Sequence, residues 1–311
     1  MNDALGQDPE ISLIREIARH LVAKTFVDVG AERGTIASAM FACGLSGVMF
    51  EPLPRHFSAL AEMARANGGQ AFPWAIAETD DVRRFFVASD ADGAELDHFH
   101  SLERLDGDTR FRHGREFDVT CRSLSSLVAE GVLSTAVGIL KIDTEGRDLA
   151  VLRGMGSMRP EMVICEFFTA GLYAGWHAAE PQLAIEHMRS IGYASYVAFK
   201  RVEGFEQCVM GPCEFLARQW GNLFFFTDDL YARAESTITA FLSTCERNLI
   251  EHWTKIAEDR VAKETVIGEL SQALDARLTA IEILDAEVSR LRRNYEHVDH
   301  PWPHATVLKS D

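Results

Sequence analysis

The sequence predicts an α/β fold in which a parallel β-sheet carries helices on both faces, followed by a long C-terminal helical extension. From Thr25 to Phe199, short β-rich runs alternate with helical stretches, an alternation typical of doubly wound sheets. Between Asp229 and Glu296 there is no proline and one glycine, which favours unbroken helix. The 311 residues are 47% hydrophobic and 25% charged, as in globular proteins with a full core.

Local patterns predict the elements in order. A helix begins at Asp8-Pro9, an N-cap followed by a first helical residue, and keeps an apolar face up to Leu21. The alternation then predicts strand 25–30, helix 35–43, strand 47–51, helix 54–67, strand 71–77, strand 138–143, helix 147–155, strand 162–167, helix 181–191 and strand 194–199. Residues 90–116 are polar without a period, which predicts an inserted loop near the carboxyl edge of the sheet. The apolar run 222–226 predicts an antiparallel edge strand that closes the sheet.

The C-terminal extension predicts one long helix or a helix pair. Its apolar residues form a heptad seam that Arg277 alone interrupts: Ile267, Leu270, Leu274, Ile281, Leu284, Val288, Leu291 and Tyr295. We therefore expect residues 1–228 to form the main domain, 229–296 a coiled-coil segment for homo-oligomerisation, and 297–311 a flexible tail. The coil can be parallel or antiparallel, with Arg277 fixing its register. The alternative is that the helix folds back along its own domain.

Charge and cysteine usage limit the partners and the compartment. The net charge is −16, and a field of that sign repels nucleic acid and anionic membranes. No apolar stretch approaches the length of a membrane span, and the N-terminus lacks the apolar core of an export signal. The six cysteines are scattered without a C-x-x-C pair, so we expect reduced thiols in the cytoplasm.

The first candidate binding motif is the turn after the first strand. Gly30 and Gly34 follow Asp28 with the spacing G-x-x-x-G, which lets a ligand approach the backbone near a helix N-terminus. The spacing differs from G-x-G-x-x-G and so disfavours a nicotinamide dinucleotide. Glu51 ends the second strand, where a carboxylate can accept both hydroxyls of a ribose. Alone, each feature also suits a turn or surface without a ligand.

The second candidate motif ends the strand at 138–143. Lys141, Asp143 and Glu145 alternate there, so they share one face near the crevice where doubly wound sheets bind ligands. Burying charged side chains at such a place costs free energy unless they form ion pairs or take part in binding or catalysis. A structural ion pair between Lys141 and Glu145 is the alternative.

Together these motifs resemble the FkbM-type S-adenosylmethionine-dependent methyltransferases. The resemblance covers residues 26–227 and is carried by DVGAERG at 28–34, FEP at 50–52, AIAETDD from Ala75, TCRSLSSL at 120–127, LKIDTEG at 140–146, LRG at 152–154 and VICE at 163–166. One departure is Glu32, where the family usually carries Asn.

The resemblance implies a Rossmann-like class I methyltransferase fold and S-adenosylmethionine as cofactor. In such a site, the turn around Asp28 binds the methionine part, Glu51 the ribose, and Trp74 or Ala75 lies near the adenine. The implied cofactor-binding set is Asp28, Gly30, Ala31, Gly34, Glu51, Pro52, Trp74 and Ala75. The implied reaction is O-methylation of a hydroxyl on a sugar, glycan or secondary-metabolite acceptor.

The chemistry then requires a proton acceptor near the acceptor hydroxyl. Asp143 is the first choice, with Lys141 orienting it or lowering the pKa of the hydroxyl, and Glu145 or Glu166 as alternative bases. A divalent metal bridging Asp143 and a second carboxylate is conceivable, although no dedicated ligand set is evident. The H-x-H of His98 and His100, and the tail histidines His297, His300 and His304, more plausibly lie in solvated segments. The competing functions are a coiled-coil assembly protein with a cofactor-binding or degenerate Rossmann-like domain and a nicotinamide-dependent oxidoreductase.

Overall fold

The structure is a computed structural model that describes residues 8–96, 98–104, 111–172, 180–202 and 205–296. The chain divides into two compact units, residues 1–249 and 250–311, and each is described by itself. The predicted tail at 297–311, with its three histidines, lies outside the described residues. The predicted domain boundary after residue 228 stays a prediction.

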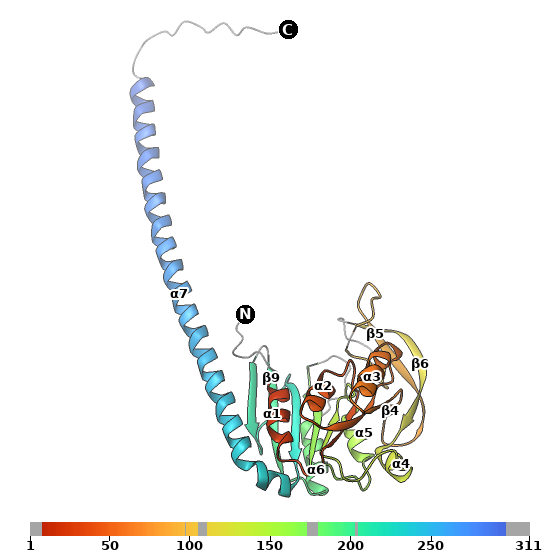
Figure 1. The fold of residues 1–311 in the computed structure, drawn as a ribbon. Coiled ribbons are helices and arrows are strands. Elements are labelled where there is room, and N and C mark those ends of the chain that lie inside the picture. The colour runs from red at the N-terminus through yellow and green to blue at the C-terminus, as the bar shows by residue number, and fades with distance from the viewer. Residues whose placement is uncertain (1–7, 97, 105–110, 173–179, 203–204, 297–311) are drawn as a thin grey trace, which may run out of the picture. The chain divides into compact units, whose positions relative to one another are not determined.

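The first unit is built on a mostly parallel main sheet (Figure 1). Its strands are, in spatial order, β10 (Phe205–Met210), β9 (Ser195–Val202), β11 (Trp220–Phe226), β8 (Met162–Phe168), β7 (Ile139–Ile142), β1 (Thr25–Val29), β2 (Ser46–Phe50) and β3 (Gln70–Phe72). From β3 to β8 all neighbouring pairs are parallel. The predicted doubly wound parallel sheet is therefore confirmed.

The predicted edge strand at 222–226 is wrong in its position. These residues belong to β11, which is antiparallel as predicted but pairs with β8 on one side and β9 on the other. The outer strand on that side is β10, a hairpin partner of β9. The side chains from Leu223 to Phe226 are fully buried, because they alternate between the apolar layers on the two faces of the sheet.

Helices cover both faces of the main sheet (Figure 1). One apolar layer joins α1 (Pro9–Ala18), α2 (Thr35–Ala42), α3 (Pro54–Ala66) and the first turns of α7 to the sheet. The opposite layer holds α4 (Leu124–Ala129), α5 (Asp148–Arg153) and α6 (Pro181–Ser190). As the sequence predicts, α1 starts with Pro9 after a cap in which Asp8 Oδ1 accepts from the Glu10 N–H at 2.9 Å.

A second, three-stranded sheet corrects two predictions. It contains β4 (Ala75–Ile76), β6 (Arg112–Arg122) and β5 (Asp81–Ser89), with β6 in the middle. The predicted strand 71–77 is therefore split, because β3 belongs to the main sheet and β4 to the small one. The predicted loop 90–116 ends inside β6, whose charged and largely exposed first half hid its strand character. Residues 97 and 105–110 within that prediction lie outside the described part.

The predicted C-terminal helix is one continuous helix, α7 (Asp228–Glu296). In the first unit its start packs against the sheet through Leu230, Ala234 and Ile238, all buried. In the second unit the apolar side chains of α7 are exposed. Within the described ranges, every helix is too short or too polar to cross a bilayer.

Candidate functional site

The candidate site is a pocket at the carboxyl ends of β1 and β7. The chain runs from β1 outward to β2 in one direction and from β7 outward to β8 in the other, so the order of strands reverses here, which is where open α/β sheets hold ligands. The pocket is open to solvent, and carboxylates, aromatic rings and aliphatic side chains line it together, a mixture typical of small-molecule sites.

Both sheets contribute to the pocket wall. Loops of the main sheet supply Gly30, Glu32, Glu51, Pro52, Asp143, Thr144 and Glu145, while the small sheet and its neighbourhood supply Trp74, Ala75, Ile76, Phe85, His98, His100 and Leu102. The predicted residues that line the pocket are thus Gly30, Glu51, Pro52, Trp74, Ala75, Asp143 and Glu145. The other predicted residues, Asp28, Ala31, Gly34 and Lys141, do not line the pocket.

Gly30 lets β1 and β7 end close together. Its φ of +67° is a conformation that favours glycine, and a Cβ on it would lie 1.8 Å from the carbonyl oxygen of Asp143. Any other residue would push the two loops apart. The predicted approach of a ligand to this turn stays a prediction, and the group that lies against Gly30 in this structure is the Asp143 carbonyl.

Glu51 is a buried carboxylate with fixed orientation. The residue is 6% exposed, Oε1 accepts from the Leu53 N–H at 2.8 Å, and Oε2 accepts from the Glu32 N–H at 2.9 Å. Burial raises the pKa of Glu51 to about 7, against the lowering by these two donors. Each oxygen keeps a lone pair for a further donor, so a pair of ligand hydroxyls can be bound.

The turn favours Asn at position 32 but tolerates Glu. The φ of Glu32 is +50°, a region that Asn adopts more readily than Glu. The contact to Glu51 comes from the Glu32 backbone N–H. It therefore survives the exchange of side chain.

Trp74 gives the pocket an aromatic wall. Its ring stacks on Phe72 with centroids 4.5 Å apart and planes 15° apart, and Phe72 in turn stacks on Phe50 at 5.7 Å. The Arg122 guanidinium lies 5.3 Å from the Trp74 ring centroid on this ladder. The wall is rigid because each ring is fixed by a neighbour.

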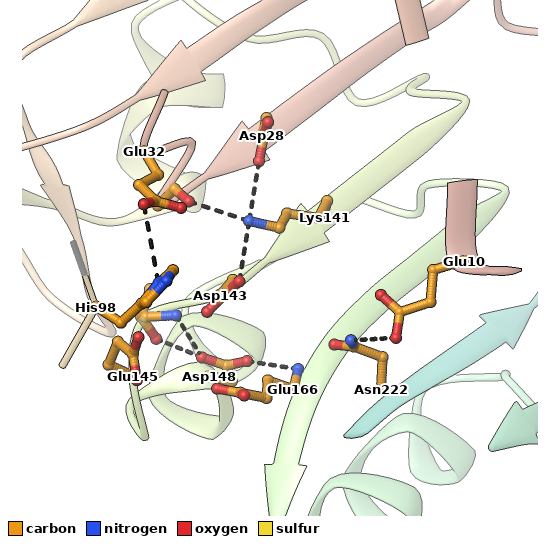
Figure 2. Close-up of polar contacts among 12 residues, drawn as sticks. Glu10, Asp28, Glu32, His98, Lys141, Asp143, Glu145, Asp148, Glu166 and Asn222 are labelled. Carbon is orange, nitrogen blue, oxygen red and sulfur yellow. Dashed lines mark hydrogen bonds and ion pairs between the residues drawn. The ribbon is translucent and has the colours of Figure 1, made fainter. Parts of the chain in front are cut away.

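Lys141 connects two carboxylates behind and beside the pocket (Figure 2). Its Nζ lies 3.4 Å from an oxygen of Asp28 and 3.4 Å from one of Asp143, and it donates to the Gly30 carbonyl at 3.0 Å. Asp28 and Lys141 are register partners on β1 and β7, and Lys141 and Asp143 alternate along one face. The described ion pairs of Lys141 are thus to Asp28 and Asp143, so the alternative pair with Glu145 is wrong.

Burial and neighbouring charges together shift the pKa values of Lys141 and Asp28, two members of the row Asp28, Lys141 and Asp143. Burial alone would lower the pKa of Lys141, but the carboxylates of Asp143 and Asp28 outweigh it and raise that pKa above its ordinary value. Asp28 is fully buried, which raises its pKa, while Lys141 opposes the rise. The Asp143 side chain differs from both because 43% of it is exposed. It is the member of the row that faces the pocket.

Two further carboxylates, those of Glu145 and Asp148, follow β7 (Figure 2). Glu145 accepts from the Phe99 N–H at 3.1 Å, and burial followed by the charge of Asp143 raises its pKa to about 8. Asp148 accepts from the N–H groups of Thr144 at 2.9 Å and Glu166 at 2.7 Å, and burial raises its pKa to about 6. Asp148 ties the loop after β7 to β8. The sequence gives only one signal for it, an acidic residue in the first turn of a helix.

The histidines of the H-x-H motif have separate environments. His100 Nδ1 accepts from the Ala88 N–H at 3.0 Å and Nε2 lies 2.8 Å from the Leu96 carbonyl, while burial lowers the His100 pKa to about 4. His100 is therefore a neutral structural residue. His98 Nδ1 lies 3.8 Å from Glu32. The side chains that the structure describes contain no group of three His, Cys, Asp or Glu arranged to hold a metal ion.

Sequence reasoning missed the pocket residues His56, Phe85 and Leu102. No local motif marks them, because they reach the pocket only through the packing of the small sheet and of α3. Together with the predicted residues they form a site with two chemical ends. One end has a fixed buried carboxylate beside an aromatic wall, which suits a nucleoside, and the other has an accessible carboxylate, which can accept a proton.

Comparison with known proteins agrees with this chemistry. The sequence model of the methyltransferase FkbM domain matches residues 28–196, a range that contains every predicted site residue. Comparison with curated proteins gives no match. Similar solved structures include magnesium protoporphyrin IX methyltransferase from Synechocystis with bound SAM, at TM-score 0.37 and 8% identity over 71% of this chain and 80% of that one. Precorrin-6y C5,15-methyltransferase from Geobacter metallireducens has TM-score 0.36 and 7% identity over 70% and 87%.

Proposed function

This chain belongs to the FkbM methyltransferase family and is an S-adenosylmethionine-dependent methyltransferase; on that premise we propose that it methylates a hydroxyl of a sugar, glycan or secondary-metabolite acceptor. The cofactor supplies a methyl group already activated by the positive sulfonium. The protein's remaining tasks are to hold the two reactants in line and to take up the hydroxyl proton.

We assign cofactor binding to the Glu51 end of the pocket. The two carboxylate oxygens of Glu51 are held by backbone donors and would accept from the ribose hydroxyls. Trp74 and Ala75 would flank the adenine, and the turn at Gly30 would receive the methionine part. The donor set fits the cofactor because it offers a carboxylate for the diol and an aromatic face for the base.

The observation that carries the proposed hydroxyl chemistry is the position of Asp143. It lines the pocket with a 43% exposed side chain, while Lys141 lies 3.4 Å behind it. An exposed carboxylate oriented by a buried cation can receive the proton of an acceptor hydroxyl. Glu145 and Glu166 are weaker choices for the base. Burial raises the pKa of each, so both hold protons at higher pH than an ordinary glutamate.

The pocket charge supports an uncharged acceptor. Glu32 and Asp143 line it together, and the chain carries a net charge of −16, so phosphates and other polyanions are repelled. We therefore propose that nucleic acid is not a substrate. All six cysteines lie among the described residues as free thiols, which supports a cytoplasmic location.

The test is transfer of tritiated methyl from S-adenosylmethionine to a panel of glycosides and hydroxyl-bearing metabolites, with amines and carboxylic acids of similar size as controls. We expect label in the hydroxyl compounds that stays bound through alkali, because methyl ethers resist it whereas methyl esters release methanol. Alkali-labile label, or label in the amines alone, would contradict O-methylation. A degenerate domain serving only assembly would show no binding of S-adenosylhomocysteine by calorimetry.

A further inference from the structure

In the second unit, α7 exposes a stripe of apolar side chains that requires another surface to bury it. The stripe consists of side chains 46–65% exposed: Ile267, Leu270, Leu274, Leu278, Ile281, Leu284, Val288 and Leu291. All but Leu278 occupy the a and d positions of three and a half heptads, starting from Ile267 as a. At about 1.5 Å per residue the stripe is about 36 Å long, and so large an exposed apolar surface marks an interface. We propose that α7 pairs with α7 of a second copy as an antiparallel coiled coil centred on Thr279.

The pattern pairs with itself when reversed. In an antiparallel coil each a residue lies beside a d residue of the other helix, and a centre at Thr279 makes facing residue numbers symmetric about it. Ile267 then faces Leu291, Leu270 faces Val288, Leu274 faces Leu284, and Arg277 faces Ile281. Every core position from 267 to 291 thus has a partner inside the same segment, and no apolar core residue of the segment is left over.

Arg277 decides the orientation. In a parallel coil in register each residue faces its own copy, so two Arg277 side chains would share one core layer. The same seam extended toward Trp253 would add layers of two Lys263 and two Arg260, and like charges in facing positions are destabilising. The antiparallel arrangement separates the two arginines. It also brings Asp285 of the second copy within one turn of Arg277, on the same flank of the seam.

The flanking positions agree with the same centre. Across one flank of an antiparallel coil e positions face each other, which places Glu264 opposite Arg292 and Leu278 opposite Leu278. Across the other flank Ala280 faces Ala280, and small side chains there let the helices approach. Opposite charges at the ends and apolar residues at the middle are the complementarity expected of a specific pair.

A charge exchange at Arg277 and Asp285 tests the orientation on the full chain. We expect Arg277→Glu and Asp285→Arg each to raise the dimer dissociation constant about tenfold in sedimentation, and the double variant to return it to near wild type. The two residues are eight positions apart on one helix, too far to pair within a chain. Glu282→Arg, on the outer face, is the matched control and should change little. Circular dichroism checks that every variant remains helical. Additive losses in the double variant would overturn the antiparallel pairing.

Disulfide formation gives a second, independent readout. Mixed chains carrying Leu274→Cys and Leu284→Cys should form a disulfide between the two different variants, identified by its peptides so that the six native cysteines do not interfere. Neither variant alone should link to itself through the new cysteine. Self-linked Leu274→Cys would establish the parallel coil, and a full chain that stays monomeric at tens of micromolar would exclude self-association. Neither readout uses methyl transfer, so failure here leaves the proposed O-methylation standing.

Discussion

The two ends of the pocket hold the same chemical group in different environments. Glu51 is 6% exposed and both its oxygens accept from backbone N–H groups. The Asp143 side chain is 43% exposed and forms an ion pair with Lys141 at 3.4 Å. A carboxylate held by fixed backbone donors suits binding, because it does not reorient. One that is accessible and held by a side chain suits proton transfer, because its protonation can change without disturbing the backbone.

The largest effect is expected for Asp143→Asn, which tests whether Asp143 accepts the proton. The amide keeps the shape and removes the proton acceptor, so we expect turnover to fall by about 10²–10⁴-fold. Initial rates with an acceptor from the tritium assay measure it. Asp118→Asn, an exposed aspartate on β6, is the matched control. Turnover near the wild-type rate would make Asp143 structural and move the base to Glu145 or Glu166.

Lys141→Met tests the cation that Asp143 shares with the buried Asp28. The substitution leaves Asp28 fully buried without its cation, and breaking a buried ion pair in this way costs about 3–5 kcal/mol of unfolding free energy. Chemical unfolding measures the loss. The Asp28→Asn, Lys141→Met double variant removes both charges and should recover much of it. A double variant as unstable as Lys141→Met would show that Lys141 stabilises the fold by packing rather than by charge.

The pH dependence of stability sharpens the account of Glu51. Its pKa is about 7 in the folded protein against an ordinary 4.5, so the folded state holds the proton more tightly. Its contribution to stability is therefore complete below about pH 4.5 and is lost as the pH rises through about 7, amounting to about 3–4 kcal/mol. Glu145 and Asp148 act in the same direction. The measurement is thus the difference between wild type and Glu51→Gln, whose unfolding free energy should fall less with pH. Glu62→Gln, exposed on α3, should follow wild type.

The smallest expected effect is at the aromatic wall. Trp74→Ala removes the face proposed for the adenine and should weaken S-adenosylhomocysteine binding by about 0.5–1.5 kcal/mol, or about two- to tenfold. Trp74→Phe keeps a ring in the ladder with Phe72 and should retain most of the affinity. Equal affinities in all three proteins, measured by calorimetry, would place the adenine elsewhere in the pocket.

The parts of this molecule that could be predicted are those that depend on local sequence patterns. The strand and helix pattern from Thr25 to Phe199, the cap at Asp8 and the alternation of Lys141 with Asp143 are all short-range signals, and they predict the main sheet and one row of the site. The place of β11 depends on which strands are neighbours in space. Its apolar run cannot distinguish an edge from an interior position.

The small sheet shows the same limit at the site itself. A continuous β-like run at 71–77 predicts one strand, whereas the chain changes sheets between Phe72 and Ala75. That change brings the small sheet to the pocket, so Phe85 lines the pocket although no sequence motif predicts it there. The partner of Lys141 was missed for a related reason. Asp28 becomes its neighbour only through the register of β1 and β7.

The most direct test of the division between the two carboxylates is a calorimetric titration of S-adenosylhomocysteine into wild type, Glu51→Gln and Asp143→Asn at one pH. The account predicts that Glu51→Gln loses about 1.5–3 kcal/mol of binding free energy, or about 10- to 150-fold in affinity. Asp143→Asn should stay within about threefold of wild type. Unchanged binding by Glu51→Gln, or a loss in Asp143→Asn as large as that expected for Glu51→Gln, would contradict the assignment of one carboxylate to binding and the other to proton transfer.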